Sequence, residues 1–232
     1  MILIIAMLLM AQPPTVEEIV DRYEAAVGDP AVARAHETRI IRTKFEDTSG
    51  SEADVYEYFI APDRYLQVTV RGEGVTMRLG TNGKSVWYDS SRGLEIVPPE
   101  KVPAVVRDAV FNRHLKLRDL YPQMRVVGAA TVAGRPAWQI EATAPEGETE
   151  QMFFDAATGL LVRRKYDYML PGGSRIPRDV IYEEYTNFGG VRMPSLTRQF
   201  SPFAAVLRVE RVDHNADVFE FVFAPPACGG KK

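Results

Sequence analysis

Repeated strand-length segments constrain the fold of this chain more than any other feature of its sequence. From Glu37 onward, short runs rich in β-branched and aromatic residues are separated by turn residues such as Gly50 and the stretch 72–74. In "RYLQVTV" (64–70), apolar residues alternate with polar ones, as a strand with one buried face requires. Roughly ten such segments, with only two substantial helical segments, predict a large, mostly antiparallel sheet with helices on one side.

The stretch "LGTNGKSVWYD" (79–89) predicts a hairpin with one wholly apolar face. Asn82 and Gly83 tolerate the positive φ that both central residues of a type I′ turn need. Pairing the strands across this turn places Leu79 opposite Val86. The apolar face then consists of Val75, Met77, Leu79, Val86 and Tyr88.

The opposite face of this hairpin carries a basic and an aromatic side chain. In the same register Met77 lies opposite Tyr88, and Arg78 lies opposite Trp87. Because a guanidinium stacks on an indole ring, we expect a cation–π pair that contributes ~0.5 to 1 kcal/mol at an exposed site. A structural role for this pair is preferred to a role as an interaction patch.

Two segments are predicted to be helical. Thr15 and Glu18 form a capping box before an apolar stripe that ends at Gly28. The second segment, "PPEKVPAVVRDAVFNRHL" (98–115), has its prolines at the entry, where a missing N–H costs least. One side of this second helix carries Val102, Val105, Val106, Ala109 and Val110.

Composition and motifs give no basis for several functional classes. The net charge of −3, from 28 basic and 31 acidic residues, offers no electrostatic reason for a nucleic-acid partner. His36, His114 and His214 are far apart in sequence and lack the spacing of metal ligands. Phosphate-binding loops, dinucleotide fingerprints and Gly-x-Ser-x-Gly elbows are absent from the sequence. We therefore expect no metal, no cofactor and no catalytic residue, and the chain is not expected to be an enzyme.

The N-terminus has the pattern of an export signal. Residues 2–10 form an apolar run that stops at Ala11, which is typical of a signal peptide over residues 1–11. A misassigned start codon and a short membrane tether are the alternatives, since basic residues are missing from this segment. The single cysteine, Cys228, cannot form an intrachain disulfide. We expect a soluble periplasmic protein with one domain over residues 12–227 and a short tail over 228–232.

Several hairpin motifs resemble the LolA/LolB superfamily of outer-membrane lipoprotein-sorting proteins. The similar stretches occur in the same order and spacing over most of residues 15–227. They are "APDRYLQV" (61–68), "LGTNGKSVWYDS" (79–90), "FFDAATGLLVRRKY" (153–166), "YTNFGGVRMPSLTRQF" (185–200) and "ADVFEFVFAPPACGG" (216–230). One departure concerns the lid over the cavity in that family. Carriers of the LolA type have an arginine that holds the lid closed at the position where this chain has Ala61.

The resemblance implies an α+β fold: a strongly curved, unclosed antiparallel β half-barrel with helices covering its concave face. An apolar cavity between the sheet and these helices would hold acyl chains. For Trp138 and Ile140, the sequence leaves open whether they line the cavity or belong to a filled core. The expected cavity residues are Val75, Met77, Leu79, Val86, Tyr88, Val105, Val106, Val110, Trp138 and Ile140.

Two functions follow from the resemblance. The first is a monomeric periplasmic carrier or chaperone that binds the acyl chains of lipoproteins or other envelope lipids. The alternative is an envelope-stress sensor of the RseB-like type, which would bind an envelope membrane protein. A carrier binds lipid reversibly and passes it on, whereas a sensor changes its affinity for a protein partner when lipid binds.

Overall fold

The computed structural model describes residues 12–170 and 174–226. The expected signal peptide (1–11) and Cys228 lie outside the described residues. The described residues form 13 strands. In chain order these are β1 (Thr38–Asp47), β2 (Glu52–Ile60), β3 (Arg64–Arg71), β4 (Gly74–Thr81), β5 (Val86–Ser90), β6 (Gly93–Ile96), β7 (Gln123–Val132), β8 (Arg135–Thr143), β9 (Thr149–Asp155), β10 (Leu161–Met169), β11 (Arg175–Phe188), β12 (Val191–Ser201) and β13 (Ala205–His214).

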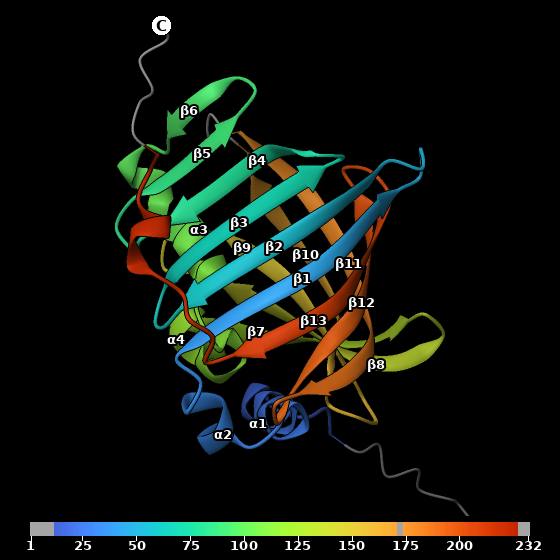
Figure 1. The fold of residues 1–232 in the computed structure, drawn as a ribbon. Coiled ribbons are helices and arrows are strands. Elements are labelled where there is room, and N and C mark those ends of the chain that lie inside the picture. Colours follow the sequence, from blue (N-terminus) through green and yellow to red (C-terminus); the bar gives the residue numbers. More distant parts are fainter. Residues whose placement is uncertain (1–11, 171–173, 227–232) are drawn as a thin grey trace, which may run out of the picture.

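All these strands belong to one antiparallel sheet that does not close into a barrel (Figure 1). The strand order is β6-β5-β4-β3-β2-β1-β13-β12-β11-β10-β9-β8-β7, so β6 and β7 are the two edges. Each half is a succession of hairpins, and the halves join where β1 pairs with β13, for example at Ile41 and Val212. The sheet curves strongly, so that its two halves face each other across an interior (Figure 1). The predicted half-barrel is confirmed.

The described helices are short and lie at one side and one end of the sheet (Figure 1). They are α1 (Val16–Val27), α2 (Pro30–Arg34), α3 (Val102–Ala109) and α4 (Leu117–Leu120), with 3₁₀ turns η1 (Pro99–Lys101), η2 (Arg113–Lys116) and η4 (Glu220–Phe223). The predicted capping box is present at α1: Glu18 N donates to Thr15 Oγ1 at 3.2 Å, and Thr15 N donates to Glu18 Oε2 at 2.8 Å. The buried face of α1 covers one end of the sheet.

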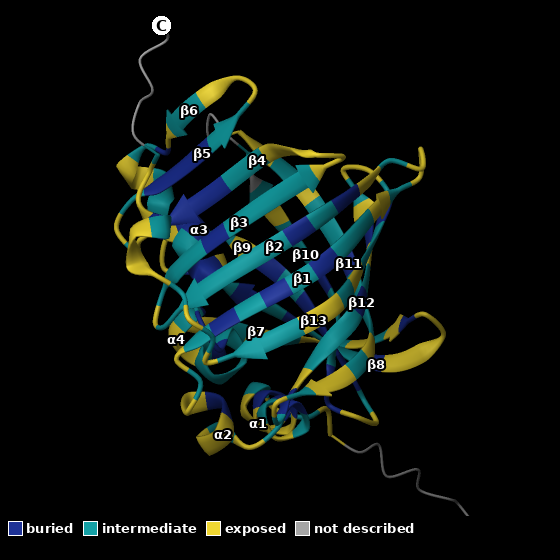
Figure 2. Ribbon diagram, viewed as in Figure 1, coloured by how far each residue is buried: buried dark blue, intermediate teal, exposed yellow. Residues whose placement is uncertain are grey.

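The second helical segment is broken into short pieces instead of one helix. Helix α3 ends at Ala109, because Val110 has extended backbone angles (φ −59°, ψ 123°) and Asn112 is left-handed (φ 52°). Val110 therefore does not extend the apolar face of α3, and the prediction that placed it there is wrong. Within α3, Ala104 and Val105 pack against the ends of β4 and β5, where buried positions are concentrated (Figure 2).

The hairpin β4–β5 has a register different from the predicted one. Leu79 pairs with Tyr88 rather than Val86, because the loop has four residues instead of two. Asn82 Oδ1 accepts hydrogen bonds from the backbone N–H groups of Lys84 and Ser85, which stabilises the longer loop. The shift is two residues, so every side chain stays on its predicted face.

The register shift also changes the partner of Arg78. Arg78 lies opposite Asp89 and forms a salt bridge of 2.9 Å with it, so the predicted stacking on Trp87 is wrong. Trp87 pairs with Gly80 and covers its backbone: a Cβ atom on Gly80 would lie 2.2 Å from the indole ring. The indole Nε1 donates to the carbonyl oxygen of Phe223 at 3.0 Å.

The convex face of β3 is covered by the C-terminal segment. Leu66 and Trp87 are buried there against Phe223. Val218 and Val222 pack at the border of this cluster. The apolar face of β3 therefore packs outward against residues that follow β13, and its polar face is turned to the interior.

Candidate functional site

A cavity of about 550 Å³ lies between the concave face of the sheet and helix α3. This volume is within the ~300 to 1,000 Å³ that is usual for small-molecule sites. Helix α3 provides Ala104 and Val105, and the β4–β5 hairpin provides apolar side chains beside them. The cavity thus occupies the place in the fold that the sequence analysis assigned to a binding site.

Four of the ten predicted residues line this cavity, namely Met77, Leu79, Tyr88 and Val105. They come from β4, β5 and α3 and form a continuous apolar side. Tyr88 is 1% exposed, and burial raises the pKa of its hydroxyl. The shared face predicted for β4 and β5 is therefore the apolar wall of the cavity.

The other six predicted residues do not line the cavity. Val86 is fully buried in the cluster behind it, and Val106 packs at the border of that cluster. Val75 is 48% exposed, at the start of β4. Val110 is half-buried beyond the end of α3. Trp138 and Ile140 belong to the core beneath α1, which settles the question that the sequence left open.

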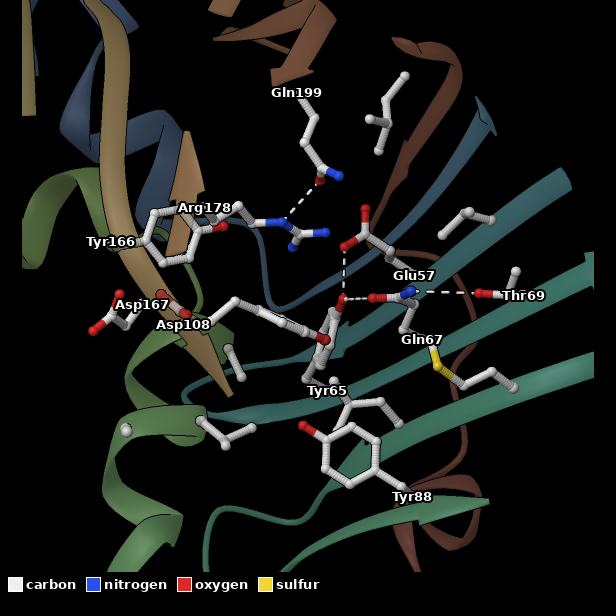
Figure 3. A pocket seen from close by; sticks show the side chains of 18 of the residues that line it. Glu57, Tyr65, Gln67, Thr69, Tyr88, Asp108, Tyr166, Asp167, Arg178 and Gln199 are labelled. Carbon is white, nitrogen blue, oxygen red and sulfur yellow. Dashed lines mark hydrogen bonds between the residues drawn. The ribbon is translucent and has the colours of Figure 1, made fainter. Parts of the chain in front are cut away.

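Sequence reasoning missed the polar part of the cavity lining, the polar wall, which has members on both halves of the sheet. It includes Glu57 from β2, Tyr65, Gln67 and Thr69 from β3, Arg178 from β11 and Gln199 from β12 (Figure 3). Strand pairing places Gln67 beside Leu79 and Thr69 beside Met77, on the same face of the sheet. Combining the β3–β4 pairing with the predicted cavity face of β4 would have found the β3 part of this wall.

A chain of hydrogen bonds runs along this polar wall. The Tyr65 hydroxyl lies 2.7 Å from Glu57 Oε1 and 3.0 Å from Gln67 Oε1 (Figure 3). Because a hydroxyl has one proton, it donates to only one of these acceptors. The hydroxyl therefore links Glu57 and Gln67 and donates to one of them at a time. Burial raises the pKa of Glu57 although Tyr65, Arg39 and Arg178 act in the opposite direction.

Arg178 projects into the cavity from the far half of the sheet (Figure 3). Its Nε donates to Gln199 Oε1 at 2.8 Å, and its guanidinium lies 4.4 Å from the centre of the Tyr168 ring. Gln199 is 2% exposed and donates in turn to the carbonyl oxygen of Phe203 at 3.1 Å. The guanidinium is thus oriented by neutral groups on two sides.

A buried ion-pair network connects α3 to the sheet. Arg164 donates to both carboxylate oxygens of Glu150, at 2.5 and 2.7 Å, and to Asp108 Oδ1 of α3 at 2.6 Å. Arg113 lies 3.3 Å from Asp108 and 3.5 Å from Glu150. Burial would raise the pKa of Glu150, but the Arg164 and Arg113 charges and the hydrogen bonds from Arg164 and Tyr121 lower it to about 2.

A second set of ion pairs also holds α3. Arg107, 7% exposed, pairs with Glu146 and Glu148, and Arg175 also pairs with Glu148. Residue 61, where carriers of the LolA type have an arginine, is alanine in this chain. In this chain, charged residues of α3 itself fasten the helix over the cavity.

Comparisons with known proteins identify the fold. No family model and no curated protein sequence matches the chain. Among solved structures, a LolA superfamily protein from Nitrosomonas europaea has a TM-score of 0.59 at 10% identity, over 91% of this chain and 98% of that one. A DUF1329 family protein from Desulfovibrio piger has a TM-score of 0.55 at 12% identity, over 90% and 97%. A putative outer-membrane lipoprotein-sorting protein domain from Vibrio parahaemolyticus has a TM-score of 0.53 at 8% identity, over 89% and 93%.

These neighbours establish a LolA-like fold for this chain, as the sequence motifs predicted. At identities of 8 to 12%, the likeness concerns the fold alone. Among the described residues, every helix is too short or too polar to span a bilayer. The part of the chain that the structure describes also contains no group of three or more His, Cys, Asp or Glu residues arranged to hold a metal ion.

Proposed function

We propose that this chain is a non-enzymatic periplasmic carrier that binds a lipid acyl chain in the cavity beneath α3. The observation that carries the proposal is the cavity itself: about 550 Å³ of space between a concave sheet and a helix, with an apolar side of Met77, Leu79, Tyr88 and Val105. If the side chains between the sheet and the helix formed a close-packed core, no such volume would remain. The lipoprotein-sorting domain among the structural neighbours supports the same class of ligand.

Affinity would come from the burial of methylene groups, at ~0.8 kcal/mol for each. The cavity size fits one ligand of ordinary small-molecule dimensions. Release would require α3 to move, because this helix forms one wall and is held by ion pairs to Glu148, just before β9, and to Arg164 of β10. Carrier function would therefore depend on the balance between lipid burial and these ion pairs.

Native mass spectrometry of protein purified without detergent tests the proposal directly. We expect co-purified lipid, and displacement of the neutral fluorescent probe N-phenyl-1-naphthylamine by added lipid. Val105→Trp should weaken binding, because the larger side chain fills part of the cavity without burying a charge. Ile96→Glu is the control, since Ile96 is 56% exposed on the edge strand β6.

Transfer to an acceptor separates a carrier from a sensor. Lipid loaded on the protein should pass to acceptor vesicles of phosphatidylethanolamine and phosphatidylglycerol. An empty protein that binds neither probe nor lipid would overturn the binding proposal. A protein that binds lipid but does not release it to vesicles would overturn the carrier role, and the regulatory alternative would then be tested with membrane-protein partners.

A further inference from the structure

The polar wall poses a physical problem for a purely apolar ligand. Arg178 lies on the cavity wall, where its guanidinium is hydrated only as long as water fills the cavity. An acyl chain that displaced this water would leave a charge without water or counter-charge, which is strongly unfavourable. A ligand that fills the cavity must therefore bring a partner for this charge or leave the charge in contact with water.

Arg178 is partly buried and differs from the arginines of the ion-pair networks that hold α3. Arg107, Arg113 and Arg164 each pair with carboxylates of the protein. For Arg178, the described residues provide only neutral partners: the amide of Gln199 and the hydroxyl of Tyr166, besides the ring of Tyr168. Since Gln199 engages Nε, the terminal nitrogens of the guanidinium are directed into the cavity (Figure 3).

None of the carboxyl groups near this guanidinium forms an ion pair with it among the described residues. Glu57, across the cavity, holds its proton more tightly than an ordinary glutamate and is hydrogen-bonded to Tyr65. Asp108 is engaged by Arg164 and Arg113. Asp167 is exposed to solvent. The guanidinium of Arg178 therefore has no carboxylate partner among the described residues, and its one positive charge matches an anion of one negative charge.

We propose that Arg178 binds the monoanionic head group of a single-chain amphiphile inside the cavity, with its hydrocarbon tail along Met77, Leu79 and Val105. Gln199 orients the guanidinium, and Tyr65 and Glu57 provide hydrogen-bonding groups on the facing wall. This inference rests on the proposed lipid-binding function and specifies its ligand. Two sources supply such an anion, the carboxylate of a fatty acid and the phosphodiester of a lysophospholipid.

Ligands with the same chain and different head groups test the proposal. Displacement of N-phenyl-1-naphthylamine is measured for palmitate, hexadecanol and palmitoyl-lysophosphatidylglycerol. We expect at least one of the two anions to bind about tenfold or more tightly than the alcohol, as expected for charge-assisted hydrogen bonds. The anion that binds more tightly identifies the source of the head group. Sodium acetate and inorganic phosphate should not displace the probe, because they lack the chain.

Variants at two arginines locate the effect. Arg178→Gln should reduce the preference for the anion to about onefold to threefold, because the anion loses its partner and hexadecanol no longer displaces water from an unpaired charge. Arg198→Gln is the matched control, since Arg198 precedes Gln199 on β12, points to the opposite face and pairs with Glu183. If Arg178→Gln does not fold, two measurements on the wild-type protein still test the proposal. They are the ratio of the affinities for the anion and the alcohol, and the ¹³C chemical shift of bound carboxyl-labelled palmitate as pH is varied. A bound carboxylate that stays ionised below its ordinary titration range supports a neighbouring guanidinium.

The two proposals fail in different ways. Equal binding of anions and alcohol by the wild-type protein, with no effect of Arg178→Gln, would overturn the head-group site and leave the lipid-binding function standing. Failure of every ligand to displace the probe would overturn the lipid-binding function itself. Loss of hexadecanol binding in Arg178→Gln would overturn the assignment of Arg178 to the head group, because the alcohol carries no charge.

Discussion

Replacement of Glu150 by glutamine tests the ion-pair network that joins α3 to the sheet. Glu150 is 4% exposed and receives two hydrogen bonds from Arg164, one from Tyr121 at 2.6 Å, and a longer contact from Arg113. Glutamine keeps the size of the side chain but removes its charge. Loss of one partner of a buried pair costs ~3 to 5 kcal/mol. Because Asp108 still faces both arginines, we expect a value near the lower limit.

The pH dependence gives this prediction a second signature. The folded protein binds the Glu150 proton more weakly than the unfolded chain, with a pKa of about 2 against an ordinary value of 4.5. The pair therefore contributes its full stability above the ordinary pKa and loses it as pH falls toward 2. The wild-type protein should lose more stability than Glu150→Gln between about pH 5 and pH 3.

Urea unfolding at neutral pH and at acid pH measures both effects. A loss of about 3 kcal/mol corresponds to a fall in Tm of roughly 6 to 12 °C for a chain of this size. Glu141→Gln is the matched control: Glu141 pairs with Arg125, which is 65% exposed, so we expect a loss below ~1 kcal/mol. A loss for Glu150→Gln no larger than for this control would refute the argument that the buried network stabilises the fold.

Three further predictions concern other parts of the molecule. Gly80→Val should destabilise the protein by about 1 to 3 kcal/mol, because its Cβ would displace the Trp87 ring; urea unfolding followed by tryptophan fluorescence measures this, and an unchanged midpoint would contradict it. Arg107→Gln should speed lipid release in stopped-flow transfer assays, since it removes the ion pairs to Glu146 and Glu148, and an unchanged rate would mean that α3 does not limit release. Above the ordinary glutamate pKa of 4.5, Glu57→Gln should become more stable relative to the wild-type protein as pH rises. The pKa of Glu57 is raised in the folded protein, so wild-type stability falls as pH rises from 4.5 through this raised pKa. Parallel pH profiles of the two proteins would count against a protonated Glu57.

Much of the fold could be predicted because strands and helix starts have local causes. Alternating side chains and turn residues located the strands, and the Thr15–Glu18 capping box located α1. The hairpin register was wrong because the Asn82 side chain stabilises a four-residue loop, which competes with the tighter turn. An error of two residues leaves each side chain on its face, so the predicted places of Met77 and Leu79 remained correct.

The polar wall could not be found from one strand alone. Alternation in β3 separates two faces but does not say which face is interior. Leu66 and Val68 are covered on the convex side by Val222 and Phe223, which lie more than a hundred residues later in the chain. Long-range packing of this kind has no local signature. For the same reason, Ile140 belongs to a core completed by α1 and not to the cavity.

The position of α3 in the chain determines how proteolysis would divide the protein. Residues 97–122 connect β6 to β7, the two opposite edges of the sheet, and α3 is part of this strap. Residues 38–96 and 123–214 form meanders whose strands pair with each other only at β1 and β13. A protease cut within the strap would therefore break no strand pairing, and the two fragments would stay associated through that seam. Helix α3 therefore lies on the segment that links the two halves, and its displacement leaves the sheet intact.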